Sequence, residues 1–506
     1  MLPITDILFS PALLTILLPL AGAVLALGYS KMPRSRANAF QGVVIGTTLL
    51  LAAKLVSDAP AGVSPQMRLF RVAPDLYLSL RVDAAGALFG LTIAALWFAT
   101  FVFAVGYLRD DPRAGRYHTF SMLCFAGLMG VAYAGDFFTL LALYELFSIL
   151  SYALIVHEGT AKAVAAGRKY IVYIVSGGSL LVMGAALTFT LAGTLGFEPG
   201  GILPPDAAPA SVALAALLLI AGFGVKAALV PLHGWVVDAH PAAPAPFSAA
   251  LSGVMVAAGA FAIVRVVYEI VGPGWLAALG MDRWLAALAA FTVISAAVIA
   301  IRQDDLKRRL AYSTISQMAY VTLGAFLLGA GALTGALVHI TNHAFMKGAL
   351  FLCAGVLARD AGVQRVSQMH GIARRYPVTM AVFAIAALGM IGTPPLSGFI
   401  SKWVLGRGMF DAGAGGYLFV LVGGAALAAV YLLPVLSVAY LGEQEGGGES
   451  EPVRSGPRAW REASPYLLVP LIALTVITVL LGSAAFMDVS ALSLARMAAG
   501  LLATGG

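Results

Sequence analysis

The sequence predicts an all-α polytopic membrane protein with about 14 transmembrane helices. Of the 506 residues, 60% are hydrophobic and only 11% are charged, whereas an ordinary soluble domain has about 25% charged residues. Apolar runs of about 18 or more residues recur along the chain, and each can cross a hydrocarbon layer about 30 Å thick as a helix. The short alternating segments of a transmembrane barrel do not recur, so helices are expected to span the membrane.

Hydropathy places fourteen candidate spans, with boundaries uncertain by several residues. They cover residues 7–29, 37–57, 83–108, 117–134, 137–157, 169–194, 209–232, 246–271, 283–301, 309–328, 333–357, 378–404, 415–441 and 464–484. We divide the chain accordingly into residues 1–116 with the first three spans, 117–271 and 283–441 with five spans each, and 442–506 with a loop and the last span.

The net charge of +7 comes from basic residues in short loops, so it indicates membrane topology rather than nucleic-acid binding. Alternate loops hold most of them, including Arg34, Arg113 and Arg308, and these loops are expected to be cytoplasmic. The chain is expected in the inner (plasma) membrane of the cell, with both termini outside the cytoplasm.

The first apolar stretch is too long for a signal-peptide core and is expected to be a span. Cys124 and Cys353 lack the spacing of a disulfide framework or metal site.

Two segments between the spans have a character of their own. Residues Met67 to Leu80 alternate polar and apolar side chains, which predicts an external β-hairpin over the helices. Residues Gly442 to Arg461 are rich in Gly, Glu, Ser and Arg, which predicts a flexible cytoplasmic loop.

Two spans contain helix breakers beside a lysine. Pro231 follows Lys226 in span 7, and the pair Pro394 and Pro395 precedes Lys402 in span 12. The two lie five spans apart, so spans 4–8 and 9–13 could form two inverted five-helix repeats, each with one broken helix. Unwound backbone is tolerated in a membrane only inside protein or beside a wet cavity, so this pair of breaks indicates a transport path.

Ionisable groups at membrane depth cost about 2.5–3.5 kcal/mol on insertion scales, so each one retained is a functional hypothesis. Glu145 has no basic residue at helical neighbour spacing, so it needs a partner on another helix or a proton. Lys226 lies beside the Pro231 break, where it could exchange a proton. The structural alternatives are an ion pair between helices for Glu145 and a side chain that extends to the interface for Lys226.

His339, His343 and Lys347 follow one another at intervals of four residues, which places them along one helix face. Three protonatable groups in this row could relay protons over about 12 Å, at a rise of 1.5 Å per residue. The alternatives are structural histidines or a metal pair, although no acidic ligand shares the face. Lys402 could belong to the same path or could mark a helix end.

Further ionisable residues are weaker candidates for a proton path. Lys169 opens span 6 and could extend towards Glu145 or to the interface. His233, Asp238 and His240 would line the cytoplasmic side of the break in span 7, or only shape that loop.

Three other charged residues near or within spans are expected to be structural, namely Asp83, Arg265 and Glu269, the last two at pairing distance i, i+4. The sequence has no GxxxxGK[ST] loop, no cysteine cluster and no Rossmann fingerprint, so we expect no cofactor in this chain. The driving force for transport is then an ion gradient or a partner protein.

Five motifs along the chain, in order, carry a family resemblance. They are YELFSILSY, KAALVPLHGWVVDAHPAAPAP, DDLKRRLAYSTISQMAY, HITNHAFMKGALFL and GTPPLSGFISKW. They resemble the signatures of the antiporter-like subunits shared by complex I, the Mrp cation/proton antiporters and membrane-bound hydrogenases. The resemblance covers spans 3 to 13. It implies that Glu145, Lys226, His339, His343 and Lys402 are the proton-path residues.

The resemblance implies a proton-translocating subunit of a multisubunit membrane complex, with H⁺ and Na⁺ as candidate ions and other membrane subunits as partners. One departure is Ala257 in SGVMVAAGAF, where many relatives carry a lysine that links the two half-channels. Lys402 and the chain length resemble the Mrp D-type component and hydrogenase relatives most. Two alternatives stay open: a proton-flux subunit of an inorganic-carbon uptake system with a cytoplasmic zinc protein, and a structural scaffold with a lost proton path.

Overall fold

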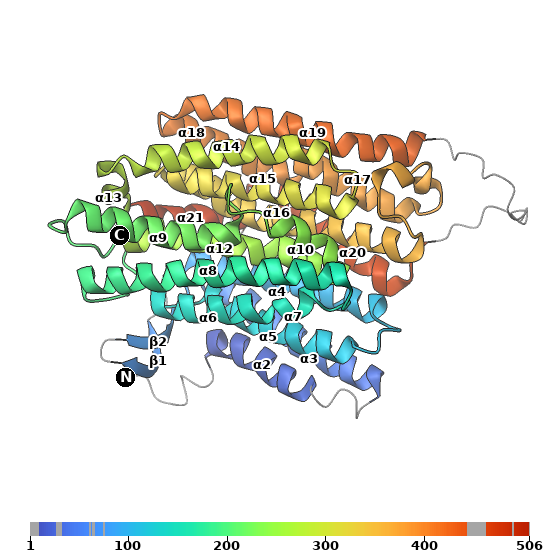
Figure 1. Ribbon diagram of the computed structural model, residues 1–506, viewed down its shortest axis with the longest axis horizontal. Helices are drawn as coiled ribbons and strands as arrows, with labels where there is room; N and C mark the ends of the chain where they lie inside the picture. Colours follow the sequence, from blue (N-terminus) through green and yellow to red (C-terminus); the bar gives the residue numbers. More distant parts are fainter. Residues whose placement is uncertain are drawn as a thin grey trace, which may run out of the picture.

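The computed structural model describes residues 10–26, 33–59, 62, 66–73, 76–442, 462–487 and 490–504. Its helices run mostly along one common axis, which is horizontal in Figure 1. Ten helical segments of the described chain are long and apolar enough to cross a membrane. The chain is therefore a polytopic helical membrane protein, as the composition predicts.

The first half of the described chain contains helices of very different lengths. They are α2 (Pro11–Ala26), α3 (Arg34–Asp58), α4 (Ala84–Tyr107), α5 (Ala114–Ala132), α6 (Phe137–Leu150), α7 (Tyr152–Ile155), α8 (Ala161–Ala192), α9 (Pro209–Ala227), α10 (Val236–Ala242), α11 (Ala245–Ala250), α12 (Val256–Arg265) and α13 (Pro273–Ala278). Two π-helical stretches, η3 (Leu251–Met255) and η4 (Val266–Val271), flank α12. The segment from α11 to η4 is thus one long, irregularly wound helix.

The second half contains the helices α14 (Met281–Ile301), α15 (Leu306–Phe326), α16 (Ala330–Asp360), α17 (Pro377–Ile391), α18 (Ser397–Asp411), α19 (Leu418–Leu441), α20 (Pro465–Ser483) and α21 (Ala491–Thr504). Short 3-10 turns lie at η5 (Val366–Gln368), η6 (Ile372–Arg374) and η7 (Gly415–Tyr417). Each of the fourteen predicted segments overlaps a helix of the structure. The ends of the first segment, and residues 443–461 of the predicted cytoplasmic loop, lie outside the described residues.

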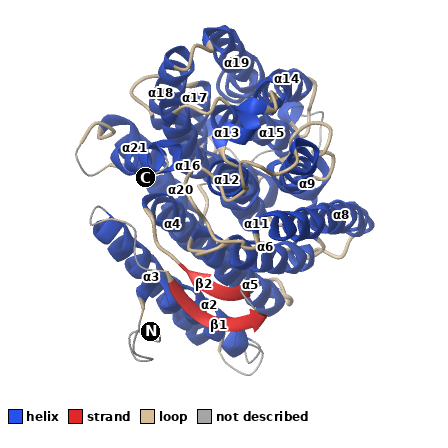
Figure 2. Ribbon diagram, turned by 90° about the vertical axis from the view of Figure 1, so that its left-hand side faces the viewer, coloured by secondary structure: helices blue, strands red, loops and turns tan. Residues whose placement is uncertain are grey.

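The core of the bundle is α16, which lies near its centre in Figure 2. Every residue of this helix from Ala332 to Leu357 is buried, and it packs on α4, α11, α15, α17, α18, α20 and α21. A helix that is buried all round needs no polar face, yet this one carries several polar and ionisable residues. Their partners must therefore come from the surrounding helices.

The predicted hairpin is confirmed. Strand β1 (Met67–Ala73) pairs antiparallel with β2 (Leu76–Leu80), with Met67 opposite Leu80. The hairpin lies at one end of the bundle, below α6 (Figure 1). The Ser79 amide donates to Thr139 Oγ1 over 2.8 Å, and the Ser79 hydroxyl donates to Asp136. The hairpin is therefore fixed to the start of α6.

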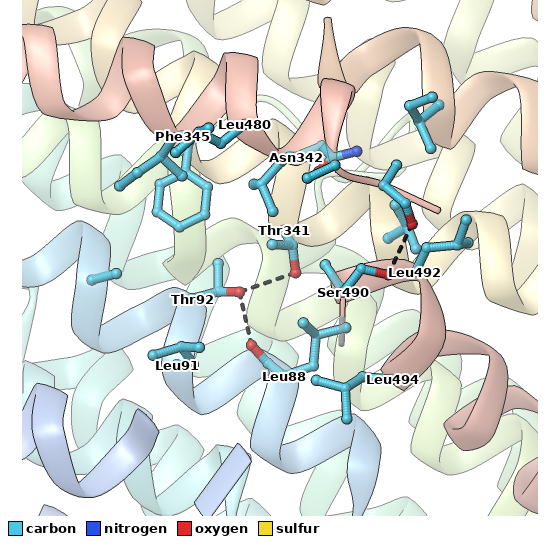
Figure 3. Close-up of a pocket in the computed structure, with 18 of the residues that line it drawn as sticks. Leu88, Leu91, Thr92, Thr341, Asn342, Phe345, Leu480, Ser490, Leu492 and Leu494 are labelled. Atoms are coloured by element: carbon cyan, nitrogen blue, oxygen red, sulfur yellow. Dashed lines mark hydrogen bonds between the residues drawn. The ribbon is translucent and has the colours of Figure 1, made fainter. Parts of the chain in front are cut away.

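The C-terminal helix α21 was not predicted from the sequence. Its 14 residues are too few to span a membrane, so the hydropathy pattern gave no signal for it. It packs on α16, α4 and η4, and Leu492 and Leu494 from this helix lie beside α4 residues in Figure 3. The bundle thus has a peripheral helix that covers part of its side.

Both helix breaks occur beside the predicted prolines. Helix α9 ends at Ala227, Ala228 has a left-handed conformation (φ 62°), and helical structure resumes at α10. Helix α17 ends at Ile391, Gly392 is left-handed (φ 100°), and α18 follows at Ser397. The sequence predicted one broken helix in span 209–232 and one in span 378–404, and the helix ends at Ala227 and Ile391 confirm both breaks.

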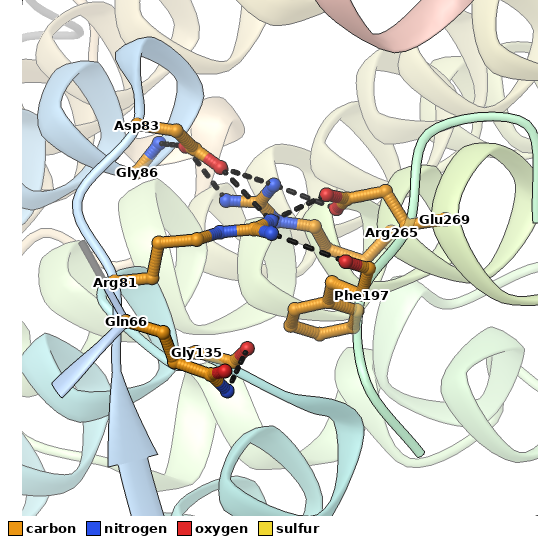
Figure 4. Close-up of polar contacts among 8 residues, drawn as sticks. All are labelled: Gln66, Arg81, Asp83, Gly86, Gly135, Phe197, Arg265 and Glu269. Carbon is orange, nitrogen blue, oxygen red and sulfur yellow. Dashed lines mark hydrogen bonds and ion pairs between the residues drawn. The ribbon is translucent and has the colours of Figure 1, made fainter. Parts of the chain in front are cut away.

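Two arginines and two carboxylates form a buried charge cluster at the hairpin end (Figure 4). Arg265 contacts both oxygens of Asp83, over 2.7 and 2.8 Å, and Glu269 over 2.7 Å. Arg81 contacts Glu269 over 2.5 Å. The predicted i, i+4 pair is confirmed, and Asp83 and Arg81 complete a neutral set. Since Asp83 also accepts a hydrogen bond from the Gly86 amide over 2.8 Å, the cluster joins the start of α4 to the end of α12 and η4.

We predict that Arg265→Leu lowers the stability of the protein by about 3–5 kcal/mol, because the change leaves two carboxylates in an apolar interior with Arg81 alone. Thermal unfolding of the detergent-solubilised protein measures the effect. Arg407→Leu is the matched control, because the Arg407 side chain is 79% exposed and lies 3.9 Å from Asp411. Equal unfolding temperatures for both variants would contradict a structural role for the cluster.

Candidate functional site

Lys226 lies in the last turn of α9 and is completely buried. Its ammonium group donates to the Tyr170 hydroxyl over 2.7 Å. Three aromatic rings surround it, with centroids at 5.0 Å for Phe147, 5.0 Å for Tyr170 and 5.4 Å for Trp235. The lysine therefore has a polar and aromatic environment, with no carboxylate of the described residues in direct contact with it.

The break after α9 creates this environment. Helix α9 ends at Ala227, and the Val225 carbonyl in its last turn accepts both from the Ala228 amide over 3.3 Å and from the Trp235 indole over 2.8 Å. This hydrogen bond holds the Trp235 ring beside Lys226. On the other side, the Tyr170 hydroxyl donates to the Ser148 carbonyl over 2.7 Å, which orients it towards the lysine.

Glu145 lies half-buried on α6, against α8. A methyl group at Gly178 of α8 would meet Glu145 Oε2 at 2.7 Å, so the carboxylate lies directly against the backbone of α8 and would have to shift to admit a side chain there. Glu145 Oε1 is buried and has no hydrogen-bond partner among the described residues. Lys226 and Glu145 both contact the α6–α8 pair, but the described part of the chain shows no ion pair between them.

The expectation that Lys169 extends towards Glu145 is wrong. Helix α8 begins at Ala161, with the Thr160 side chain as its cap. Lys169 and Gly178, which contacts Glu145, are nine residues or about 13 Å apart along the helix. Lys169 instead pairs with Asp238 over 2.7 Å, and the ion pair lies at the partly exposed end of the α9 break.

The other residues of the α9 break separate into two environments. Asp238 is within 3.6 Å of Arg308 as well as in contact with Lys169, and the His233 ring lies 6.4 Å from the Tyr312 ring. His240, in contrast, is fully buried, and its ring stacks on Phe351 of α16 at 4.8 Å. Neither ring nitrogen of His240 has a partner among the described residues.

His339, His343 and Lys347, which follow one another at intervals of four residues on α16, are all buried. His339 Nδ1 lies 2.9 Å from the Ser401 hydroxyl, and the His339 and His343 rings are 6.1 Å apart. Both nitrogens of His343 lack a partner within the described residues. Lys347 donates to the Leu310 carbonyl over 3.0 Å. The row therefore contains polar atoms with unused hydrogen-bonding capacity, which a passing proton or water requires.

Lys402 lies in the second turn of α18 rather than at a helix end. It donates to the carbonyls of Met390 and Ile391, over 2.6 and 3.0 Å, in the last turn of α17. Carbonyls at a helix C-terminus favour a cation. The ring of Tyr320 lies 5.6 Å from the Lys402 nitrogen and 5.9 Å from the His339 ring, so it is close to both the lysine and the histidine row.

Hydroxyl groups connect the helix from α11 to η4 with the row of His339, His343 and Lys347 on α16. Ser252 of η3 and Thr314 of α15 are hydrogen bonded over 2.6 Å. Thr314 donates to the Leu310 carbonyl over 3.0 Å, and the same carbonyl accepts from Lys347. Ala257, where many relatives carry a lysine, is buried without a polar group. A continuous polar contact thus runs from Ser252 to Lys347 in the absence of that lysine.

The sequence-based argument missed Tyr170, Ser401, Tyr320 and Thr314. These neutral side chains do not stand out in a membrane sequence, because they lower the hydropathy of a span much less than charged side chains do. Only two carry a positional hint, because Tyr170 follows Lys169 and Ser401 precedes Lys402. Sequence reasoning therefore found the charged groups but not the groups that hold them.

Comparisons with known proteins identify relatives of this chain. Residues 134–428 match the family described as NADH:quinone oxidoreductase/Mrp antiporter, transmembrane region. The N-type component of NADH-quinone oxidoreductase from Desulforudis audaxviator is 38% identical over 427 residues, which are 81% of this chain and 82% of that protein. The D-type component of the Na⁺/H⁺ antiporter from Alkalihalophilus pseudofirmus is 28% identical over 469 residues, which are 87% of this chain and 92% of that protein.

A chain in the structure of the Mrp complex from a Dietzia species superimposes with a TM-score of 0.85, at 25% identity and with 98% of each chain covered. The family match covers more than half of this sequence and includes both helix breaks. The chain therefore belongs to the family of membrane subunits shared by NADH:quinone oxidoreductases and Mrp antiporters.

Proposed function

We propose that this chain is a proton-translocating, antiporter-like subunit of a multisubunit membrane complex. The observation that carries the proposal is the pair of helix breaks, each beside a buried lysine that has only neutral hydrogen-bond partners among the described residues. A buried ammonium group without a carboxylate is costly, so a lysine kept there is expected to gain and lose a proton during function.

In the first half of the path, Lys226 and Glu145 are the exchanging groups. Lys226 binds the Tyr170 hydroxyl in this structure, and Glu145 has an oxygen without a partner among the described residues. Movement of the lysine towards the carboxylate would replace a neutral contact by an ion pair. Protonation at Lys226 would thus depend on which of the two contacts it makes.

In the second half, the row of His339, His343 and Lys347 leads towards Lys402. The unused nitrogens of His343 and the His339–Ser401 contact support a relay through this row. His240 faces the same helix at Phe351. The contact from Ser252 to Lys347 holds the two halves together through the Leu310 carbonyl, which accepts from both Thr314 and Lys347, so it orients the row without passing a proton itself.

We assign fourteen spans, with spans 4–8 and 9–13 as inverted repeats. The α9–α10 and α17–α18 breaks support this assignment, because each contains a proline and a left-handed residue beside a lysine. The four domains follow as residues 1–116, 117–271, 283–441 and 442–506. Both termini would face away from the cytoplasm across the inner membrane.

Other membrane subunits are the expected partners, and H⁺, with Na⁺ as a second candidate, is the transported ion. Relatives are named as subunits of NADH-quinone oxidoreductase and of a Na⁺/H⁺ antiporter. On the outer side of α6 and α8, four apolar side chains are exposed next to Glu145, namely Leu146, Ile149, Val172 and Val175. This exposed apolar surface supports a protein neighbour there. A half-buried carboxylate is better tolerated against protein than against hydrocarbon. Electron donors and cofactors are expected in other chains.

We predict that Lys226→Ala and Glu145→Ala each lower proton transport by about 10²-fold, as the loss of an acid–base group does. Transport is measured with a pH-sensitive dye in inverted membrane vesicles, and assembly by recovery of the intact complex. Lys54→Ala is the control, because the Lys54 side chain is 58% exposed and pairs with Asp58. Normal transport by both Lys226→Ala and Glu145→Ala would exclude the proposed path.

We further predict that Tyr170→Phe lowers proton transport by about tenfold, since a hydrogen bond to a charged group contributes about 1.5–3 kcal/mol. The ring that packs on Lys226 is kept, so only the hydroxyl contact is tested. Tyr440→Phe, at a 40% exposed position on α19, serves for comparison. A Tyr170→Phe protein with unchanged transport would show that the hydroxyl does not position Lys226.

A further inference from the structure

A cavity of about 530 Å³ lies where several long helices end on the same side of the bundle. Its described lining comes from the starts of α3 and α20 and from the ends of α4 and α16, and all four helices are long and apolar enough to cross a membrane. Helix α4 packs against both α3 and α20, and Figure 2 shows the three along one side of the bundle. The cavity is therefore at the boundary between the hydrocarbon layer and the lipid headgroups.

The charged side chains around this cavity are mostly basic. Three arginines belong to its described lining, namely Arg34 at the start of α3, Arg109 just after α4 and Arg359 in the last turn of α16. Asp110 is the one carboxylate in that lining; its side chain is 88% exposed and lies 3.9 Å from Arg359. With His118 neutral, three positive groups and one negative group give a formal charge of +2. The cavity therefore attracts an anion.

Two of the three arginines have a structural role at the end of α4. The Arg34 guanidinium donates to the carbonyls of Arg109 and Asp111, the second over 3.2 Å. Arg359 donates to the Gly106 carbonyl over 2.6 Å. Carbonyls at a helix end attract cations in this way. The Arg109 side chain, in contrast, has no hydrogen-bond or ion-pair partner in the described part of the chain, so its guanidinium group is available to a ligand.

Neutral hydrogen-bond donors lie beside the arginines. Ser35 is in the first turn of α3, which has no side-chain cap. Ser464 precedes α20, and its hydroxyl makes no capping bond there. The first amide groups of a helix lack a partner within the helix and favour an anion. Guanidinium groups, hydroxyls and helix-start amides together are donors that suit a phosphate group.

An apolar stripe continues from the cavity along α4 into the membrane. Val105 belongs to the cavity lining, and Val102, Phe98, Ala95 and Leu91 follow at intervals of three or four residues. All five are partly exposed, so they face outward on one side of the helix. At a rise of 1.5 Å per residue, the stripe extends about 21 Å from the cavity. A hydrocarbon chain attached to an anion in the cavity would lie against it.

We propose that this cavity binds the headgroup of an anionic phospholipid of the phosphatidylglycerol type, with one acyl chain along the stripe of α4. The phosphate group lies among Arg34, Arg109 and Arg359 and pairs with the free guanidinium of Arg109. The excess of positive charge favours a headgroup that carries no ammonium group. A soluble phosphate would satisfy the arginines but would not cover the apolar stripe. The site contains none of the residues of the proposed proton path, so it is independent of the proposed function.

The test is native mass spectrometry of the full-length protein in a neutral detergent, titrated with phosphatidylglycerol or with phosphatidylcholine of the same acyl chains. The ratio of lipid-bound to lipid-free protein gives a dissociation constant for each lipid. We expect phosphatidylglycerol to bind about 30-fold more tightly, as two excess arginines near an anionic headgroup give. Equal binding of the two lipids would overturn the proposal.

Arg109→Gln locates the site without disturbing the fold, because the side chain has no partner among the described residues to lose. We expect about fivefold weaker binding of phosphatidylglycerol and unchanged binding of phosphatidylcholine. Arg302→Gln is the matched control, since Arg302 is also exposed, directly follows a helix, α14, and has no side-chain partner in the described part of the chain. Binding by Arg109→Gln that equals the wild type, or an equal loss in both variants, would contradict the site.

A competition experiment distinguishes the lipid from a soluble phosphate. Glycerol 3-phosphate carries the same phosphate group but no acyl chain, so we expect no displacement when its concentration equals that of phosphatidylglycerol. Full displacement under these conditions would assign the arginines to a soluble phosphate and would overturn the lipid site.

Discussion

The structure depends on one constraint: a charge inside the hydrocarbon layer must be neutralised by protein, because no bulk water can do so. The chain meets it in two ways. At the hairpin end, Arg81, Asp83, Arg265 and Glu269 form a balanced set with direct contacts. At the helix breaks, Lys226 and Lys402 have hydroxyl and carbonyl oxygens but no carboxylate of the described residues in contact. A balanced set has no reason to exchange protons, whereas an unbalanced lysine does, and this difference separates the structural charges from the proposed path.

The two breaks are alike in position but not in chemistry. At the end of α9 the Val225 carbonyl accepts from the Ala228 amide and from the Trp235 indole, and Lys226 contacts a tyrosine hydroxyl and aromatic rings. The carbonyls freed at the end of α17 go directly to Lys402. Direct contact with helix-end carbonyls favours the charged form of a lysine more than contact with one hydroxyl does. The two lysines therefore differ in the oxygen atoms that surround their ammonium groups.

The sequence predicted the class of fold, the hairpin, the places of both breaks and the buried lysines, because each leaves a local signal in hydropathy, alternation or proline position. It did not predict partners. Arg265 and Asp83 lie far apart in the chain, and nothing in either segment indicates that they meet. For Lys169 the sequence left two possibilities open, Glu145 or the interface, but helix α8 starts earlier than hydropathy indicated and the lysine pairs with Asp238 at a partly exposed position. The short helix α21 was missed because it is shorter than a span.

Helix α16 connects these parts. It is buried from Ala332 to Leu357, so any shift of its side chains must be transmitted to the helices around it. His339 contacts α18 and Lys347 contacts α15 on the side of the proposed path, while Thr341 and Asn342 line a cavity of about 440 Å³ beside α4 and α20. His339 and Asn342 are less than one helical turn apart. A rearrangement at the break before α18 would therefore move both contacts together, because Ser397 and Ser401 lie one turn apart on α18 and contact Asn342 and His339 on one face of α16.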